Sequence, residues 1–300
     1  MSDARLNIGA GLLSVAVAMG LVAVKLWALA ATGALSVAAS LADSAVDLMV
    51  SVAATAAMIY AARPPDEDHA FGHTSAEDLA ALAQGVFIAI SGLVIGAMAV
   101  QRLRVPATAG LGDERLGLWV MGLSVVVTLG LVIWQGRVAR RTGSRVVAAD
   151  QLHYVGDMIP TLGAMLSLWS SKAFGLAQVD SVVALAAAAF MVLTAYKIGR
   201  GAFDALMDRR ADPSVIAGIA KIASDWPGVR GFHDLKTRTA GSRTFVNLHI
   251  ELDGEQTLRE AHAISAALRR AILAAYPQTD VIIHKDVARR PVAGADDTKG

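Results

Sequence analysis

The sequence has no cysteine, which removes thiolates from any metal site and leaves imidazole and carboxylate groups as the available ligands. Copper(I) is therefore a poor candidate for binding. Charge is also scarce: the formal net charge is +1, so the electrostatic attraction that drives nucleic-acid binding has no source, and no nucleic-acid partner is expected. Only 18% of the 300 residues are charged while 55% are hydrophobic, which is too apolar for a soluble chain of this length and indicates a membrane protein.

Six apolar stretches are each long enough, at roughly 20 residues or more, to cross the hydrocarbon core of a bilayer. The first runs well past the length of a signal-peptide core and is expected to be retained as a span. The sequence thus predicts an all-α domain of six transmembrane helices in contact with membrane lipid. The predicted spans are Ile8 to Ala31, Leu35 to Ala62, Leu79 to Leu103, Leu116 to Trp134, Ala148 to Trp169 and Val179 to Ile198.

Basic residues are unevenly distributed among the connecting segments. Because the number of spans is even, both termini lie on one side of the membrane, and the positive-inside rule makes the more basic side cytoplasmic. Arg102, Arg104 and Arg115 around an expected outer loop run against this bias. The residues that favour cytoplasmic termini are Arg137, Arg140, Arg141 and Arg145 after the fourth span and Lys197, Arg200, Arg209 and Arg210 after the sixth.

The composition changes near Asp208 to that of a soluble domain, with scattered charge and no further span. Residues 1–207 are therefore expected to form the membrane domain, 208–288 a soluble domain, and the polar stretch 289–300 a disordered tail. Hydrophobic periodicity in the soluble part predicts an α-β-β-α-β order, which suits a small α+β sheet with helices on one face. The predicted elements are helix Pro213 to Asp225, strands Phe232 to Arg238 and Thr244 to Leu252, helix Thr257 to Ala275 and strand Asp280 to His284.

Four ionisable residues lie inside predicted spans, where such groups are costly and rare and tend to line an ion path. Asp43 and Asp47 are in the second span, and His153 and Asp157 are in the fifth. The spacing of four residues within each pair places both members on one face of a helix. Together the two pairs can supply four oxygen and nitrogen ligands, which is the tetrahedral number that zinc prefers.

A second group follows the second span and combines one acidic residue with two histidines. Asp66, His69 and His73 are spaced by three and four residues, so their side chains would converge if this segment were helical. Such a run is otherwise a solvated polar loop. This group is therefore a weaker indication of a metal site than the pairs inside the spans.

The third group lies in the soluble domain. His249 is on the polar face of a predicted strand, and His284 and Asp286 share a face because side chains alternate along a strand. His233 and His262 are on other elements, so four separate elements would have to converge. All seven histidines of the chain fall within the three groups, and none is left over as an incidental surface residue.

The order of these residues resembles the cation diffusion facilitator family, and most closely its bacterial zinc/proton antiporters. The resemblance covers nearly the whole chain and does not rest on one short motif. It is carried by residues 41–47 and 69–73, the basic stretch 140–142, residues 152–154 with Asp157, and the stretches 226–229 and 280–284.

The resemblance implies a homodimer in a bacterial inner membrane that exports Zn²⁺ by proton antiport through alternating access, with Cd²⁺, Fe²⁺ or Mn²⁺ as alternative cargo. Both termini would be cytoplasmic. It implies a mid-membrane transport site formed by Asp43, Asp47, His153 and Asp157. Charge balance among three carboxylates and one imidazole in that site predicts exchange of metal for protons, with His153 and Asp47 as the proton-coupling residues.

The resemblance also implies two sites outside the membrane spans. A loop site would use Asp66, His69 and His73. A metallochaperone-like cytoplasmic domain would sense metal and support dimerisation, and Asp286 would bridge two metals there. The residues implied for this binuclear site are His233, His249, His262, His284 and Asp286.

The sequence departs from the family pattern at one position of the expected dimer interface. Where the related antiporters carry a lysine two residues after the second loop histidine, this chain has Ser75, although the matching acidic partner, Asp208, is present. A charge interlock between the two subunits is therefore either absent or made by another cation.

Two other functions are weighed against metal export. An intramembrane metalloprotease would also bury histidine and aspartate, but it typically uses an HExxH motif, which the sequence lacks, so no enzyme is expected. A proton-coupled exporter of organic cations stays open, because buried carboxylates alone do not distinguish a metal from an amine. The histidine-rich soluble domain favours metal.

Overall fold

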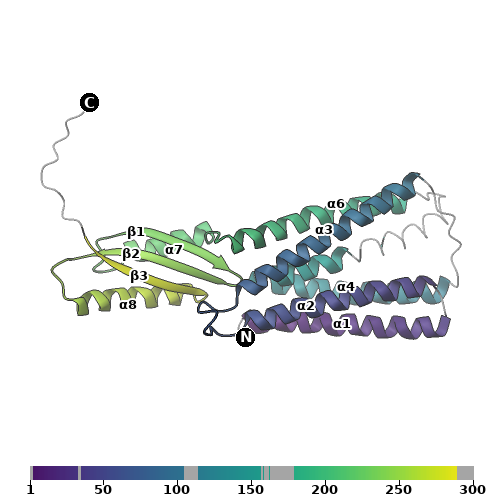
Figure 1. The fold of residues 1–300 in the computed structure, drawn as a ribbon, viewed down its shortest axis with the longest axis horizontal. Coiled ribbons are helices and arrows are strands. Elements are labelled where there is room, and N and C mark those ends of the chain that lie inside the picture. The colour runs from purple at the N-terminus through teal and green to yellow at the C-terminus, as the bar shows by residue number, and fades with distance from the viewer. Residues whose placement is uncertain are drawn as a thin grey trace, which may run out of the picture. The chain divides into compact units, whose positions relative to one another are not determined.

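The computed structural model describes residues 3–32, 35–104, 114–156, 158, 162 and 179–288 (Figure 1). The chain divides into two compact units, Met1–Leu206 and Met207–Gly300. The first unit is helical and the second is a small α+β unit, so the predicted fold class is confirmed. The helices of the first unit are α1 (Asp3–Thr32), α2 (Leu35–Ala61), α3 (Ser75–Arg104), α4 (Glu114–Thr142), α6 (Val179–Leu206) and a helical segment, 145–156.

Four helices in the described part of the chain are long and apolar enough to cross a membrane. Large apolar side chains such as Leu26, Leu93 and Val126 are exposed on them, as expected for helices that face lipid. The predicted fifth span is described only as far as residue 156 and at 158 and 162. The count of six spans therefore stays a prediction. The four candidate spans are Asp3–Ala31, Ser44–Ala61, Ser75–Gln101 and Gly122–Thr142.

Small residues allow α3 and α6 to pack closely. A Cβ atom added at Gly85 of α3 would lie 3.3 Å from the carbonyl oxygen of Ala195 and 3.3 Å from the Cα of Gly199, both on α6. A Cβ added at Gly92 would likewise meet the carbonyl oxygen of Ala188 at 3.3 Å. Such close backbone approach is how helices associate in a bilayer, where the hydrophobic effect gives no driving force between them.

Helix α4 is longer than the predicted fourth span and ends at Thr142, so Arg137, Arg140 and Arg141 lie on the helix rather than in a loop. Positive charge near the C-terminus of a helix is favourable because of the helix dipole. Gly143 ends the helix in a left-handed conformation, with φ 69°. After it, Arg145 of the next helical segment donates a 2.6 Å hydrogen bond to the buried Asp78 of α3.

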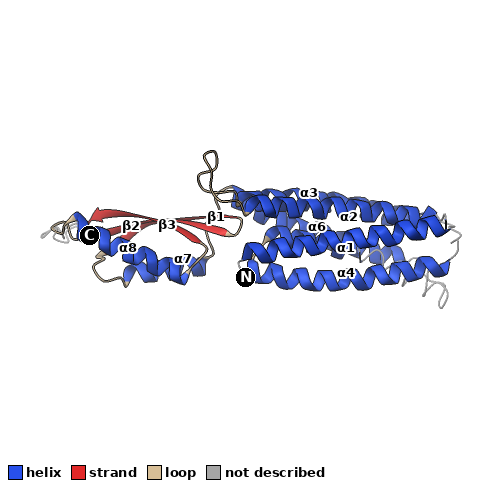
Figure 2. Ribbon diagram, turned by 90° about the horizontal axis from the view of Figure 1, so that it is seen from below, coloured by secondary structure: helices blue, strands red, loops and turns tan. Residues whose placement is uncertain are grey.

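The second unit contains a three-stranded sheet in the order β1-β2-β3 (Figure 2). Strand β2 pairs antiparallel with β1 and parallel with β3. Figure 2 shows both helices on one side of the sheet, and Leu248 of β2 is buried among Ile219 of α7 and Leu268 of α8. The elements are α7 (Pro213–Ser224), β1 (Gly231–Ala240), β2 (Arg243–Leu252), α8 (Leu258–Ala275) and β3 (Thr279–Val287).

Ser75 and Asp208, the two positions of the expected charge interlock between subunits, have different surroundings. Ser75 is the first residue of α3. Within the second unit, Arg238 of β1 donates a 3.3 Å hydrogen bond to Asp208. A cation other than the missing lysine is thus next to Asp208 in the same chain, which leaves an interlock between subunits a prediction.

Candidate metal centres

Strand register brings three of the soluble-domain histidines into one row. His233 of β1 pairs with His249 of β2, and His249 pairs with His284 of β3. The ring centroids are 5.2 Å apart in the first pair and 4.6 Å in the second. The alternate residues of β2, such as Leu248 and Ile250, are buried in the core. The histidine row therefore lies on the sheet face opposite α7 and α8.

Asp286 lies at the centre of this row. Its carboxylate Oδ2 is 2.9 Å from His249 Nδ1 and 3.3 Å from His233 Nε2, and its Oδ1 is 3.3 Å from His284 Nε2. The hydrogen bond with His249, assisted by the charge of the nearby histidines, holds the pKa of Asp286 below its usual range. The residue is therefore ready as an anionic ligand, and both of its oxygens have histidine neighbours.

These residues fit a metal. Ligand atoms of His233, His249 and Asp286 all lie within 4.8 Å of one another. One carboxylate and imidazole nitrogens form a donor set that suits zinc. Glu251 lies 3.3 Å from His233 Nδ1 and so can orient that ring. Glu251 was not predicted, although it shares the polar face of its strand with His249.

His262 stands apart from the other predicted ligands of this site. It is exposed on α8, and α8 packs on the opposite face of the sheet from the histidine row (Figure 2). The predicted five-residue set is therefore not assembled within one chain: the structure brings four members together and leaves the fifth on the other layer.

The loop group converges without a helix. Residues 63–74 form turns instead, because Asp66 Oδ1 accepts hydrogen bonds from the backbone N–H groups of Asp68 and His69 at 3.1 and 2.7 Å. The hydrogen bond from the His69 backbone is the main reason why the pKa of Asp66 is below its usual range. The segment is thus a polar loop and not a helix, and its turns bring the three side chains together.

The three loop side chains also fit a metal ion. His73 Nε2 is 3.2 Å from Asp66 Oδ2, and His69 Nδ1 is 3.3 Å from Asp66 Oδ1. Ligand atoms of all three residues lie within 4.8 Å of one another. His73 is 5% exposed, and its Nδ1 atom has no hydrogen-bond partner in the described part of the chain.

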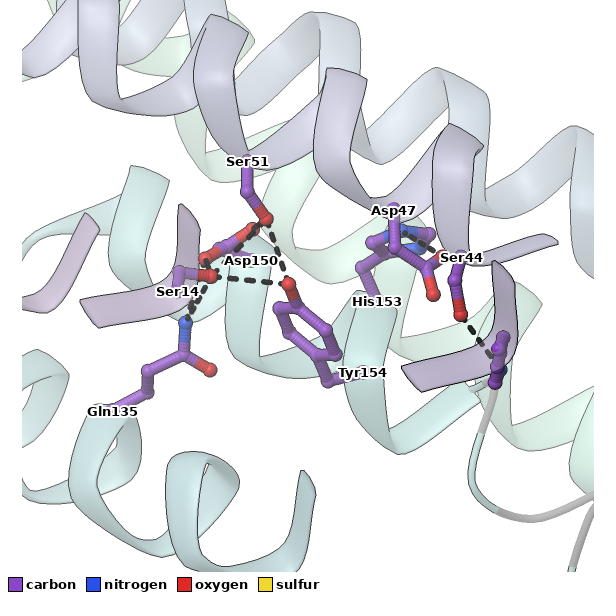
Figure 3. Close-up of polar contacts among 9 residues, drawn as sticks. Ser14, Ser44, Asp47, Ser51, Gln135, Asp150, His153 and Tyr154 are labelled. Atoms are coloured by element: carbon purple, nitrogen blue, oxygen red, sulfur yellow. Dashed lines mark hydrogen bonds and ion pairs between the residues drawn. The ribbon is translucent and has the colours of Figure 1, made fainter. Parts of the chain in front are cut away.

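Half of the predicted transmembrane quartet is described in side-chain detail. His153 Nε2 lies 3.2 Å from Asp47 Oδ1 (Figure 3). This contact connects the segment 145–156 to α2. His153 is buried and Asp47 is nearly so. Asp43 is on α2 one turn before Asp47, but its side chain is outside the described part, and Asp157 lies outside the described residues altogether.

A cavity of about 60 Å³ adjoins this pair. Its wall includes Asp47, Tyr154 and Lys25. Lys25 is 8% exposed and donates a 2.6 Å hydrogen bond to Ser44. Sequence reasoning missed Lys25, although an ionisable residue inside the first predicted span was a signal that could have found it.

Two family models match almost the whole chain. The model described as "Cation efflux transmembrane domain" matches residues 11–207. The model described as "Cation efflux protein, cytoplasmic domain" matches residues 211–287. The division between these models falls close to the division between the two structural units.

Curated relatives are similar along nearly their full lengths. The cation-efflux pump FieF of Pectobacterium carotovorum subsp. carotovorum (strain PC1) is 38% identical over 283 residues, which are 94% of this chain and 93% of the relative. FieF of Salmonella arizonae is 36% identical over 282 residues, with the same two coverages. Among solved structures, the zinc form of CzrB is 30% identical and covers 28% of this chain and 99% of its own, with a TM-score of 0.26, which is too low to support a structural argument. The chain therefore belongs to the cation efflux, or cation diffusion facilitator, family, and is a membrane cation-efflux transporter with a cytoplasmic dimerisation domain.

Proposed function

We propose that the protein exports Zn²⁺ from the cytoplasm in exchange for protons, by alternating access. The observation that carries this proposal is the 3.2 Å contact between His153 and Asp47 beside a cavity in the helical unit. It places an imidazole and a carboxylate from two helical elements within reach of one metal ion. Asp43 and Asp157, each four residues from a member of this pair in the sequence, would complete a four-ligand site.

Zinc is the metal that this donor set supports best. Carboxylates with one imidazole suit Zn²⁺, Cd²⁺, Fe²⁺ and Mn²⁺ alike, and availability contributes as much to selection as intrinsic affinity does. Four ligands favour zinc, which prefers tetrahedral coordination, over Mn²⁺, which prefers six oxygen ligands. The imidazole-rich row in the soluble domain supports the same choice.

Charge balance supports exchange for protons. Three carboxylates with a doubly charged metal carry about −1, and an ionised Lys25 beside them brings the loaded site to about 0. Without metal or protons the same groups carry about −2 in a poorly solvated region, which is a costly state. The empty site should therefore take up protons at His153 and Asp47 before it returns inward, and the metal should displace them when it binds.

Flux measurements in proteoliposomes across a panel of cations test the cargo. We expect the purified protein to move Zn²⁺, and to move Cd²⁺, Fe²⁺ or Mn²⁺ more slowly. An organic cation such as tetraethylammonium, the cargo of the rival function, should not be moved. Transport of the organic cation with no movement of Zn²⁺ would contradict the proposed cargo.

The proposed location is the inner membrane of a bacterium, with both termini in the cytoplasm. The bacterial sources of the relatives support this membrane. The basic residues near the C-terminal ends of α4 and α6 support the cytoplasmic position of the termini. The dimerisation domain would then face cytoplasmic metal. A chain with that topology can sense the ion that it exports.

A regulatory metal site is proposed on the open face of the sheet. The metal would be held by His233, His249, His284 and Asp286. It would cross-link the three strands, a connection that the metal-free domain lacks. Because His262 lies on the other layer of its own chain, a second subunit is the natural source of that ligand. Metal binding would then tighten the association of the two soluble domains in a homodimer.

The double variant His249→Ala, His284→Ala should lose the zinc-dependent stabilisation of the soluble domain. At a zinc concentration of about 100 times Kd, binding stabilises the folded state by about 2.7 kcal/mol. For a domain of this size, that corresponds to a rise in melting temperature of about 10 °C or more. Thermal melting of the soluble domain with and without zinc should show this rise in the wild type and not in the variant.

The matched control is Asn247→Ala, which removes an exposed side chain from the same strand. This control should keep the full effect of zinc. If the double variant shows the same zinc-dependent rise as the wild type, the regulatory site is wrongly assigned.

A further inference from the structure

A further ionisable side chain is buried in the helical unit and belongs to none of the predicted metal sites. Asp150 lies on the segment 145–156 and is 1% exposed. Figure 3 shows its carboxylate among polar side chains from three other helices: Ser14 of α1, Ser51 of α2 and Gln135 of α4. A carboxylate at such a position is costly to keep ionised in a membrane protein and is a candidate for function.

The groups that face Asp150 from the other helices are neutral. Gln135 Nε2 donates a 2.6 Å hydrogen bond to Asp150 Oδ2, and Ser14 Oγ donates one of 2.7 Å to the same oxygen. Ser51 Oγ is 3.5 Å from Oδ1. In the described part of the chain, no lysine or arginine pairs with Asp150. Two titratable groups on its own helix, His153 and Tyr154, interact electrostatically with Asp150, and Asp47 of α2 faces His153.

Hydroxyl groups connect Asp150 to Tyr154, which is one of the residues around the transport cavity, the cavity of about 60 Å³ beside Asp47. Ser14 Oγ, bonded to Asp150, lies 3.1 Å from Ser51 Oγ, and Ser51 Oγ lies 2.9 Å from the hydroxyl of Tyr154. Tyr154 also lines the cavity that contains Asp47. Each step along this row of oxygens is within hydrogen-bond distance. The hydrogen-bonded network therefore connects the buried carboxylate to Tyr154, a residue that also lines the cavity beside Asp47.

We propose that Asp150 is an additional proton-binding site of the transport cycle, protonated when the transport site is empty and ionised when metal is loaded. This inference rests on the proposed exchange of metal for protons. The electrostatic reason is direct: a divalent ion in the nearby cavity stabilises an ionised Asp150, whereas the carboxylates left when the metal departs destabilise it and favour proton uptake by Asp150 as well as by His153 and Asp47.

Proton transfer along the network leaves every hydroxyl unchanged. When metal loads, the O–H bond of protonated Asp150 breaks and its proton passes to Ser14, while the proton of Ser14 passes to Ser51, that of Ser51 to Tyr154, and that of Tyr154 to a water molecule. The water leaves as hydronium, and among the protein groups only Asp150 changes charge. The reverse sequence restores its proton when the metal leaves.

Proton release on zinc binding tests the proposal, with purified full-length protein in weakly buffered detergent solution and a pH indicator. Asp150→Asn preserves the shape of the side chain, and Gln135 can turn its amide so that Oε1, which has no hydrogen-bond partner among the described residues, accepts from the new amide. We expect this variant to bind as much zinc as the wild type and to release about one proton fewer per zinc bound at the transport site. Equal proton release at equal zinc binding overturns the proposal.

Infrared difference spectroscopy of the wild type provides a measurement that does not depend on the folding of Asp150→Asn. Zinc loading should remove the carbonyl band of a protonated carboxylic acid, and Asp150→Glu, which keeps the carboxyl group, should shift that band. If zinc removes no such band, or if the band is unmoved by Asp150→Glu, the proposal is wrong.

Asp47→Ala separates the two proposals: if it binds as much zinc as the wild type, the transport site itself is misassigned.

Discussion

Replacement of Asp47 by alanine should lower zinc flux at least about 100-fold while leaving a folded dimer, since loss of supporting second-shell groups alone costs roughly 10–100-fold in metal affinity. Asp47 is a proposed metal ligand, and its Oδ1 atom lies 3.2 Å from His153 Nε2. Its loss would remove one quarter of the proposed coordination and one negative charge. The fold should tolerate the change, because removing one carboxylate relieves repulsion in the empty site. Zinc flux into proteoliposomes and gel filtration of the purified protein measure the two effects.

The matched control is Met49→Ala, two residues along the same helix. Met49 is 63% exposed and lines no part of the cavity. It should keep flux close to that of the wild type. Flux near the wild-type level in Asp47→Ala would remove Asp47 from the transport site, whereas equal losses in both variants would indicate general damage to α2.

Replacement of His153 by aspartate should change both the pH dependence of flux and the metal preference. Histidine binds metal only when it is neutral, and its reference pKa of about 6.5 places its titration in the working range. As pH falls through that range, protons compete with zinc for the wild-type site, so apparent affinity should fall by up to about tenfold per pH unit for each proton displaced. An aspartate titrates at much lower pH, so the variant should have a flatter profile between about pH 6 and 8.

An additional carboxylate should also favour metals that prefer oxygen ligands, so flux of Mn²⁺ relative to Zn²⁺ should rise in His153→Asp. The measurement is initial flux of each metal over a series of pH values, with equal amounts of protein inserted. A wild-type pH profile in His153→Asp would show that this histidine is not a principal proton carrier.

The sequence was informative wherever a periodic pattern placed residues on one element. Alternation along Phe245 to Leu252 predicted both the strand and the polar position of His249, and strand pairing then brought His233 and His284 beside it. The strand β3 continues past its predicted end at His284, so that Asp286 pairs with Glu251. The position of His262 relative to this row required the layer arrangement, which residue spacing within single elements does not contain.

Contacts formed by helix packing were beyond the sequence pattern. No repeated spacing in the sequence marks Asp150, Lys25 or Gln135 as part of a site. Their contacts form only when α1, α2, α4 and the segment 145–156 pack together. The loop around Asp66 shows the converse. The spacing of its residues indicated convergence only if the segment were helical, whereas the side chains converge through turn hydrogen bonds to the carboxylate.

Coupling between zinc and protons is the central claim, and zinc flux under an imposed pH gradient tests it most directly. Wild-type protein in proteoliposomes, with orientation determined, should move zinc fastest when the gradient drives protons in the opposite direction. The flux should fall when the gradient is collapsed and should be opposed when the gradient is reversed, and each zinc flux should be accompanied by a counterflow of protons. Equal zinc flux with the gradient imposed, collapsed and reversed would contradict proton exchange.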